Sequence, residues 1–232
     1  ETFRENGQLE SRGNYKDGEQ EGGLWEIYYE NGQLKSRRNF KDGKQDGLVE
    51  SYYENGQLEE RGNYKNEKKY GLHEVFHENG QLKKKGYFKN EKEQGLVESF
   101  FKNGQLSSKG NYKNGKREGL WEYFDEGGNL TDTKEYIDGD VVEKIVEYYD
   151  NGHLQSTENY KNGKKDGLWE WFYEDGQLET KQNYKNGKRD GLYESFNENG
   201  QLRQKGNFKY GKQDGLWEYY YENGQLYYRG NY

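Results

Sequence analysis

Apolar and aromatic residues recur along the chain with a period of 24 residues, after a first spacing of 25. On both sides of an Asn-Gly-Gln-Leu-like phrase they alternate with polar residues, as in 215–232. Such alternation is typical of strands, and Asn-Gly favours a tight turn because both residues tolerate positive φ. Each repeat is therefore predicted to be a β-hairpin. The phrase occurs ten times, and each copy ends in a leucine: Leu9, Leu34, Leu58, Leu82, Leu106, Leu130, Leu154, Leu178, Leu202 and Leu226.

A strict period indicates stacked units, each of which buries its apolar residues against its neighbours. We expect an all-β fold: an elongated single-sheet array of about ten 24-residue β-hairpins, an antiparallel meander twisted or curved into a rod. Twenty strands would span on the order of 90–100 Å. One domain is expected over 1–232, with a divergent unit near 134–150 that is either a bend or a distinct contact surface. Ends without caps favour end-to-end self-association.

Four columns of the repeat are predicted to form the core. Two are leucines, one in the turn phrase and one after the glycine that opens a strand: Leu24, Leu48, Leu72, Leu96, Leu120, Leu168, Leu192 and Leu216. One aromatic column is Tyr15, Phe40, Tyr64, Phe88, Tyr112, Tyr136, Tyr160, Tyr184, Phe208 and Tyr232. The other is Phe3, Tyr28, Tyr52, Phe76, Phe100, Phe124, Tyr148, Phe172, Phe196 and Tyr220.

The register of the hairpin decides whether these columns share a face. A three-residue loop ending in a left-handed glycine places Phe172 opposite Leu178 and all four columns on one side, and burial favours it. A two-residue turn instead pairs Glu170 with Lys181 and splits the columns. In either register, the frequent glycine two residues before the first aromatic column is predicted to leave room for a neighbouring ring. These glycines are Gly13, Gly62, Gly86, Gly110, Gly206 and Gly230.

Composition alone leans toward disorder, with 34% charged and 28% hydrophobic residues. The periodic aromatic residues reverse that interpretation, because each buries roughly 150–250 Å². A net charge of -7 from interleaved acidic and basic residues gives no broad cationic face, so nucleic acid is not an expected partner. The lysine-rich stretch around Lys83 is interpreted as a solvated face. The chain has no Cys, which excludes disulfides and thiolate sites and leaves the compartment open.

The sequence contains one string typical of zinc proteases, His73-Glu74-Val75-Phe76-His77. That string binds zinc on a helix, where its histidines share a face. The repeat places it on a strand, so we interpret it as accidental and predict no metal and no cofactor. No repeat carries a distinct catalytic cluster, and we therefore expect a protein that is not an enzyme.

A further aromatic stripe is the candidate binding site. If the leucines face the core, this stripe lies on the opposite surface: Trp25, Tyr29, Tyr53, Trp121, Tyr149, Trp169, Tyr173, Tyr193, Trp217 and Tyr221. Either these rings stack on one another and stiffen a thin sheet, or they form an interaction surface.

Three segments resemble the MORN-repeat variant of bacterial YwqK-like proteins: residues 28–34 (Tyr-Tyr-Glu-Asn-Gly-Gln-Leu), 110–116 (Gly-Asn-Tyr-Lys-Asn-Gly-Lys) and 214–217 (Asp-Gly-Leu-Trp). The resemblance covers essentially the whole chain, and the sixth unit lacks the Gly-Leu-Trp segment. It implies a twisted sheet of stacked hairpins that serves as a scaffold, with protein or lipid partners and an antitoxin label in some members. It brings no catalytic residues.

We therefore expect a non-enzymatic repeat scaffold that mediates protein-protein interaction along an elongated, aromatic-lined surface. The alternative is a carbohydrate-binding or cell-surface adhesion module, because Trp and Tyr rings suit sugar rings. Binding to a membrane surface is a lesser alternative.

Overall fold

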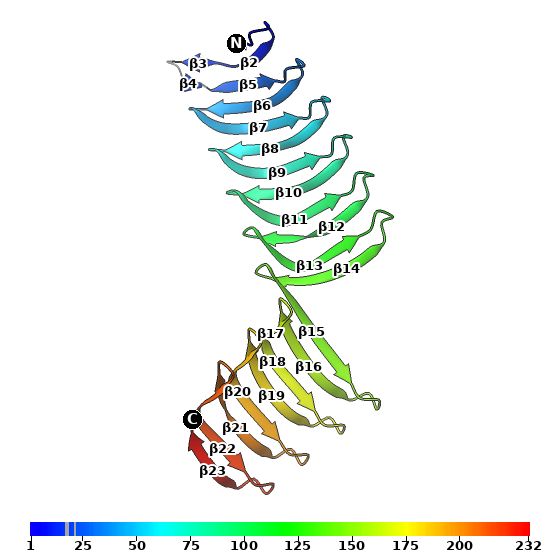
Figure 1. The fold of residues 1–232 in the computed structure, drawn as a ribbon, viewed down its shortest axis with the longest axis vertical. Helices are drawn as coiled ribbons and strands as arrows, with labels where there is room; N and C mark the ends of the chain where they lie inside the picture. The colour runs from blue at the N-terminus through cyan, green and yellow to red at the C-terminus, as the bar shows by residue number, and fades with distance from the viewer. Residues whose placement is uncertain (17–18, 21) are drawn as a thin grey trace. The chain divides into compact units, whose positions relative to one another are not determined.

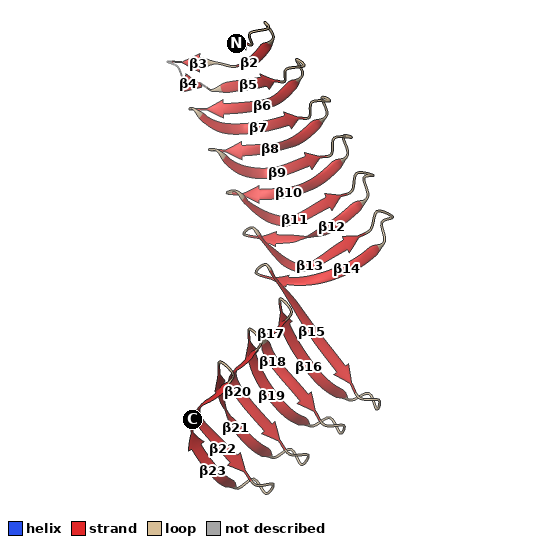
Figure 2. Cartoon of the chain, viewed as in Figure 1, coloured by secondary structure: helices blue, strands red, loops and turns tan. Residues whose placement is uncertain are grey.

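The computed structural model describes residues 1–16, 19–20 and 22–232, with the side chains of 15–16 and 19–20, Tyr15 among them, outside the description. The described residues form strands and turns, and none of them forms a helix long and apolar enough to cross a membrane (Figure 2). They divide into two compact units, Glu1–Gly139 and Asp140–Tyr232, and the boundary lies within the divergent stretch 134–150. The all-β repeat fold is confirmed.

In the first unit the strands of the main sheet pair antiparallel, each with the next one in the chain, except that β2 (Leu9–Arg12) pairs with β5 (Gly23–Tyr28) (Figure 1). The strands β3 and β4 form a separate two-stranded ribbon. The strands are β1 (Thr2–Phe3), β2 (Leu9–Arg12), β3 (Tyr15–Lys16), β4 (Glu19–Gln20), β5 (Gly23–Tyr28), β6 (Leu34–Lys41), β7 (Lys44–Tyr52), β8 (Leu58–Lys65), β9 (Lys68–Phe76), β10 (Leu82–Lys89), β11 (Lys92–Phe100), β12 (Leu106–Lys113), β13 (Lys116–Phe124) and β14 (Leu130–Ile137).

The second unit is an antiparallel meander of the same kind. Its strands are β15 (Asp140–Tyr148), β16 (Leu154–Lys161), β17 (Lys164–Lys165), β18 (Gly167–Phe172), β19 (Leu178–Lys185), β20 (Lys188–Phe196), β21 (Leu202–Lys209), β22 (Lys212–Tyr220) and β23 (Leu226–Asn231). Within each unit, the turns inside repeats and the turns between repeats line opposite edges of the sheet (Figure 1).

Both predicted registers occur, in different parts of the same hairpin. Residues 174–176 form a three-residue loop, in which Gly176 has φ 88° and donates its N–H to the Tyr173 carbonyl. Phe172 lies opposite Leu178, as the bulged loop predicts. The register then shifts, so that Glu170 lies opposite Lys181, as the two-residue turn predicts. The extra residue after the turn leucine therefore reverses the faces of the returning strand.

This shift overturns the prediction that all four columns share one core. The column of Tyr112, Tyr136 and Tyr184 lies on the side of the tryptophans, which we call the tryptophan face. The leucines after the strand-opening glycine lie on the other side, which we call the leucine face, with the second aromatic column. The most deeply buried rings, those of the tryptophans, lie on the tryptophan face, whereas most rings of the second aromatic column are only half-buried on the leucine face.

Candidate functional site

The four tryptophans of the predicted binding stripe form the core of the protein. Trp25, Trp121, Trp169 and Trp217 have only 1–5% of their surface exposed. The expectation that they line an exposed surface is therefore wrong. Each ring packs against the invariant aromatic column, so that Trp169 lies 5.2 Å from both Tyr160 and Tyr184 between ring centroids. Edge contacts of this kind stabilise aromatic pairs beyond the area they bury.

Glycines provide the space that these rings occupy. A Cβ atom at Gly110 would lie 2.3 Å from Trp121 Cδ2, and one at Gly13 would lie 2.3 Å from Trp25 Cε2. The same close approach joins Gly62 to His73, at 2.0 Å. The predicted role of this glycine column is confirmed. Two glycines are exceptions: Gly86 makes room for Val97 rather than for a ring, and the nearest neighbour of Gly230, in the last strand, is the hydroxyl of Tyr228.

Cationic side chains cover the rings of Trp121 and Trp169. The ammonium of Lys165 lies 3.7 Å from the ring centroid of Trp169, and the guanidinium carbon of Arg117 lies 4.3 Å from that of Trp121. Arg117 also donates hydrogen bonds of 2.9 Å to the hydroxyls of Tyr123 and Tyr136. In both cases the basic residue lies four positions before the tryptophan in the sequence, and this spacing could have predicted the contact.

The tyrosines of the stripe tie one repeat to the next. The hydroxyls of Tyr29, Tyr53, Tyr149 and Tyr173 each donate a hydrogen bond of 2.7–2.8 Å to a carbonyl 23 residues later. Burial raises the pKa of Tyr29, Tyr53 and Tyr173. Tyr193 is half-buried and stacks on Trp217 at 5.7 Å, whereas Tyr221, in the last hairpin, is exposed. The stripe residues thus have structural roles, apart from Tyr221.

Of the two histidines of the protease-like string, His73 lies on strand β9, as the repeat predicts, and His77 follows the end of that strand directly. His73 occupies the tryptophan column, where it is buried with Nε2 2.9 Å from the Asn63 carbonyl oxygen. His77 occupies the tyrosine column, and its Nε2 lies 2.9 Å from the Phe100 carbonyl oxygen. Both rings thus replace aromatic residues that serve the stacking of repeats.

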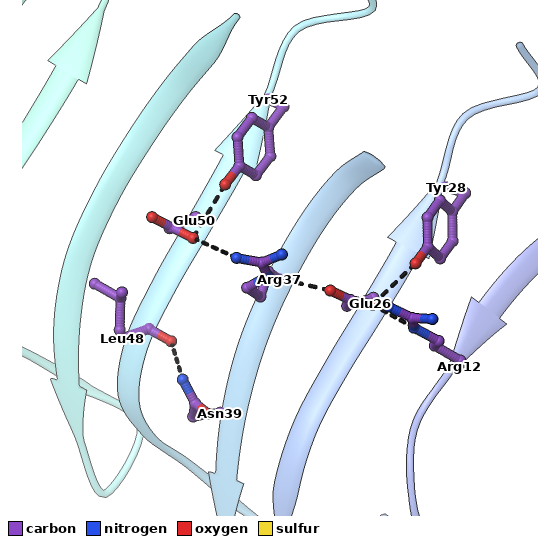
Figure 3. Close-up of polar contacts among 8 residues, drawn as sticks. All are labelled: Arg12, Glu26, Tyr28, Arg37, Asn39, Leu48, Glu50 and Tyr52. Carbon is purple, nitrogen blue, oxygen red and sulfur yellow. Dashed lines mark hydrogen bonds and ion pairs between the residues drawn. The ribbon is translucent and has the colours of Figure 1, made fainter. Parts of the chain in front are cut away.

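On the leucine face, glutamates and basic residues form a ladder across the strands (Figure 3). Arg37 Nε lies 3.1 Å from Glu26 Oε1, and Arg37 Nη1 lies 3.6 Å from Glu50 Oε2. Tyr28 and Tyr52 donate hydrogen bonds to Glu26 and Glu50. Burial opposes ionisation of Glu26, but hydrogen bonds from Arg12, Tyr28 and Arg37 hold its pKa below the ordinary value.

The same ladder continues in the second unit. There Glu218 accepts hydrogen bonds from Lys205, Arg229 and Tyr220, which lower its pKa to about 2. Lys181 pairs with Glu194 at 2.6 Å. The glutamates of this column are thus held in ion pairs within the sheet, except Glu170, which accepts a hydrogen bond of 3.3 Å from the Thr157 hydroxyl.

Beside this ladder lies the main exposed apolar feature of the repeats, which we call the leucine stripe. Its members are Leu24, Leu48, Leu96 and Leu120 in the first unit and Leu168, Leu192 and Leu216 in the second, each 37–55% exposed. The prediction that this column is core is therefore wrong. Members two strands apart lie about 10 Å from each other, since strands are spaced about 4.8 Å apart. Asparagines lie on the strands between them. The side-chain amide of Asn39, for example, donates a hydrogen bond to the Leu48 carbonyl (Figure 3).

A stack of antiparallel hairpins of one period defines a β-hairpin repeat protein. The model of the MORN repeat variant family matches residues 1–17, 21–42, 45–66, 69–90, 93–114, 117–138, 144–162, 165–186, 189–210 and 213–232. The chain belongs to this family.

The comparison with curated proteins finds no match. Among solved structures, alternansucrase in complex with isomaltononaose aligns with 15% identity and a TM-score of 0.20. The alignment covers 88% of this chain and 18% of that one. A likeness this weak carries no argument about fold or function.

Proposed function

We propose that this chain is a non-enzymatic repeat scaffold that binds another protein through the leucine stripe. The observation that carries the proposal is the exposure of the stripe in both units. A repeated apolar row beside charged residues is typical of an interaction surface with a polar rim. A repeat array also presents such a row to an extended partner.

Two further features support this function. The periodic glutamates form ion pairs within the sheet, which gives these carboxylates a structural role. The turn phrase of the repeats supports a place among bacterial YwqK-like proteins within the MORN repeat variant family. The glycan alternative finds no support in the tryptophans, because a buried ring offers no face to a sugar.

The proposal is tested by changing the leucine stripe without changing the core. Leu96→Lys with Leu120→Lys places two charges in the stripe of the first unit. Leu130→Lys is the matched control, because Leu130 is equally exposed but lies at the turn end of its strand. Affinity capture from the native cell should recover a protein with wild type and with the control, and lose it with the double variant. Equal capture by all three proteins would refute the role of the stripe.

A further inference from the structure

The two rows of turns in the second unit carry opposite charge. The turns between repeats, 161–166, 185–190 and 209–214, contain eight Lys or Arg and three Asp. The turns inside repeats, 148–153, 172–177, 196–201 and 220–225, contain five Asp or Glu and no Lys or Arg. The meander places these two sets at opposite edges of the sheet (Figure 1). Charges that alternate in the sequence are therefore separated in space, and we call the positive side the lysine edge.

Lysines face each other directly at this edge. Lys185 lies opposite Lys188, and Lys209 lies opposite Lys212. Like charges in directly opposed positions destabilise a hairpin. The ion pairs of the second unit involve Lys161, Lys181, Lys205 and Arg229, and none in the described chain involves the four facing lysines. These four ammonium groups are thus available to an external anion.

A hollow of about 620 Å³ lies between two consecutive turns of the lysine edge. Lys185, Lys188 and Lys209 line it, together with Phe208, Tyr210 and the two acidic residues Asp190 and Asp214. One oxygen of Asp190 accepts a hydrogen bond from the Tyr210 backbone N–H, at 3.3 Å. The hollow therefore combines cations, an aromatic surface and a hydrogen-bond acceptor.

Tyr210 is the unusual residue of this hollow. The corresponding turn position elsewhere is always Asn or Asp in the described chain: Asp42, Asn66, Asn90, Asn114, Asp138, Asn162 and Asn186. Tyr210 adopts the same left-handed conformation, with φ 54°, and its side chain is 74% exposed. A bulky residue rarely adopts this conformation, whereas Asn does so readily. An aromatic ring is thus held in solvent, beside unpaired lysines, in a backbone conformation that disfavours it.

We propose that this hollow binds an acidic oligosaccharide. The face of a sugar ring would pack on Tyr210, and carboxylate groups of the sugar would pair with Lys185, Lys188 and Lys209. Hydroxyl groups of the sugar would donate hydrogen bonds to Asp190. A carboxylate in the wall favours a ligand that carries hydroxyl donors as well as negative charge. This site is independent of the leucine stripe, which lies on a face of the sheet rather than at its edge.

The test is calorimetric titration of the full chain with a short oligogalacturonide at about 50 mM salt, where exposed charges are weakly screened. We expect binding that weakens as salt is added, and no binding of a neutral oligogalactoside of equal length. Tyr210→Asn should reduce affinity at least about tenfold, as removal of an anchoring aromatic residue does. Tyr210→Phe should retain it, since the ring remains. Lys185→Gln with Lys209→Gln should also reduce affinity about tenfold.

The matched control is Lys89→Gln with Lys92→Gln, which removes a facing lysine pair from a turn of the first unit. It should leave affinity unchanged. Absence of binding to wild type would overturn the proposal, as would binding that none of the variants in the hollow weakens. Equal binding of a glutamate oligomer would also overturn it, because charge alone would then be recognised.

Discussion

The ring of Trp217 fills the space that a side chain at Gly206, on the neighbouring strand, would need. A Cβ atom on Gly206 would lie 2.2 Å from Trp217 Cδ2, well inside van der Waals contact. The tryptophan ring therefore lies directly over the backbone of β21, where Phe208 packs against it with ring centroids 5.0 Å apart. The same relationship joins Gly13 to Trp25 and Gly110 to Trp121, and at these places it couples a hairpin to the one before it.

Gly206→Ala should lower the free energy of unfolding by about 2 kcal/mol, because overpacking of a close-packed site costs about 1–3 kcal/mol. Urea denaturation followed by tryptophan fluorescence measures the change. Arg203→Ala, at an exposed position of the same strand, is the control and should be near neutral. If the two variants unfolded at the same urea concentration, the packing argument would be wrong.

The sequence predicted the hairpins and both turn types, because the period and the Asn-Gly phrases are local signals. The prediction of the buried face was wrong. A single-layer sheet shows the same alternation whichever face is covered, so Leu168 and Trp169 were equally good core candidates. Which columns share a face depends on the register shift beside Phe172. Next to the turn, the strands follow the register that pairs Phe172 with Leu178. Beyond the shift, they follow the register that pairs Glu170 with Lys181. The glycines opposite Trp25, Trp121 and Trp217 already indicated the tryptophan face, since only a residue on the crowded face requires such space.

Lys165→Gln should destabilise the second unit by about 1 kcal/mol, since it removes a cation from the face of a buried tryptophan. Lys164→Gln is the matched control. Lys164 is exposed and lies opposite Lys161, so its neutralisation removes like-charge repulsion and should be neutral or slightly stabilising. Thermal unfolding of the two variants separates these effects. A larger loss from Lys164→Gln than from Lys165→Gln would contradict the assignment.

Stability should depend on pH through Glu218. Hydrogen bonds from Lys205, Arg229 and Tyr220 lower its pKa in the folded state to about 2, below the ordinary value of 4.5. A lowered folded-state pKa stabilises the fold above pH 4.5, and this contribution is lost as the pH falls from 4.5 toward about 2. Urea midpoints at pH 7 and pH 3 should therefore differ less for Glu218→Gln than for wild type. Glu222→Gln, in the neighbouring turn, should behave as wild type does, and an unchanged pH dependence in Glu218→Gln would exclude this role.

Tyr173→Phe should cost about 1 kcal/mol, because it removes the hydroxyl that donates to the Phe196 carbonyl at 2.8 Å. Tyr221→Phe is the control, since the hydroxyl of Tyr221 donates no hydrogen bond in the described chain. Hydrogen exchange of the amides around residue 196 should accelerate in the first variant and not in the second. Equal exchange in both would show that these tyrosines do not tie consecutive repeats.

Tyr210→Asn should raise the free energy of unfolding by about 1 kcal/mol, because a left-handed conformation costs a bulky residue about 1–3 kcal/mol and costs Asn less. The exposed ring contributes little packing that could offset this gain. Tyr210→Phe should leave stability unchanged, since the same strain persists. Chemical denaturation of the three proteins makes the comparison. A destabilised Tyr210→Asn would show that the ring serves the fold, whereas a stabilised one shows that the chain keeps Tyr210 at the expense of stability.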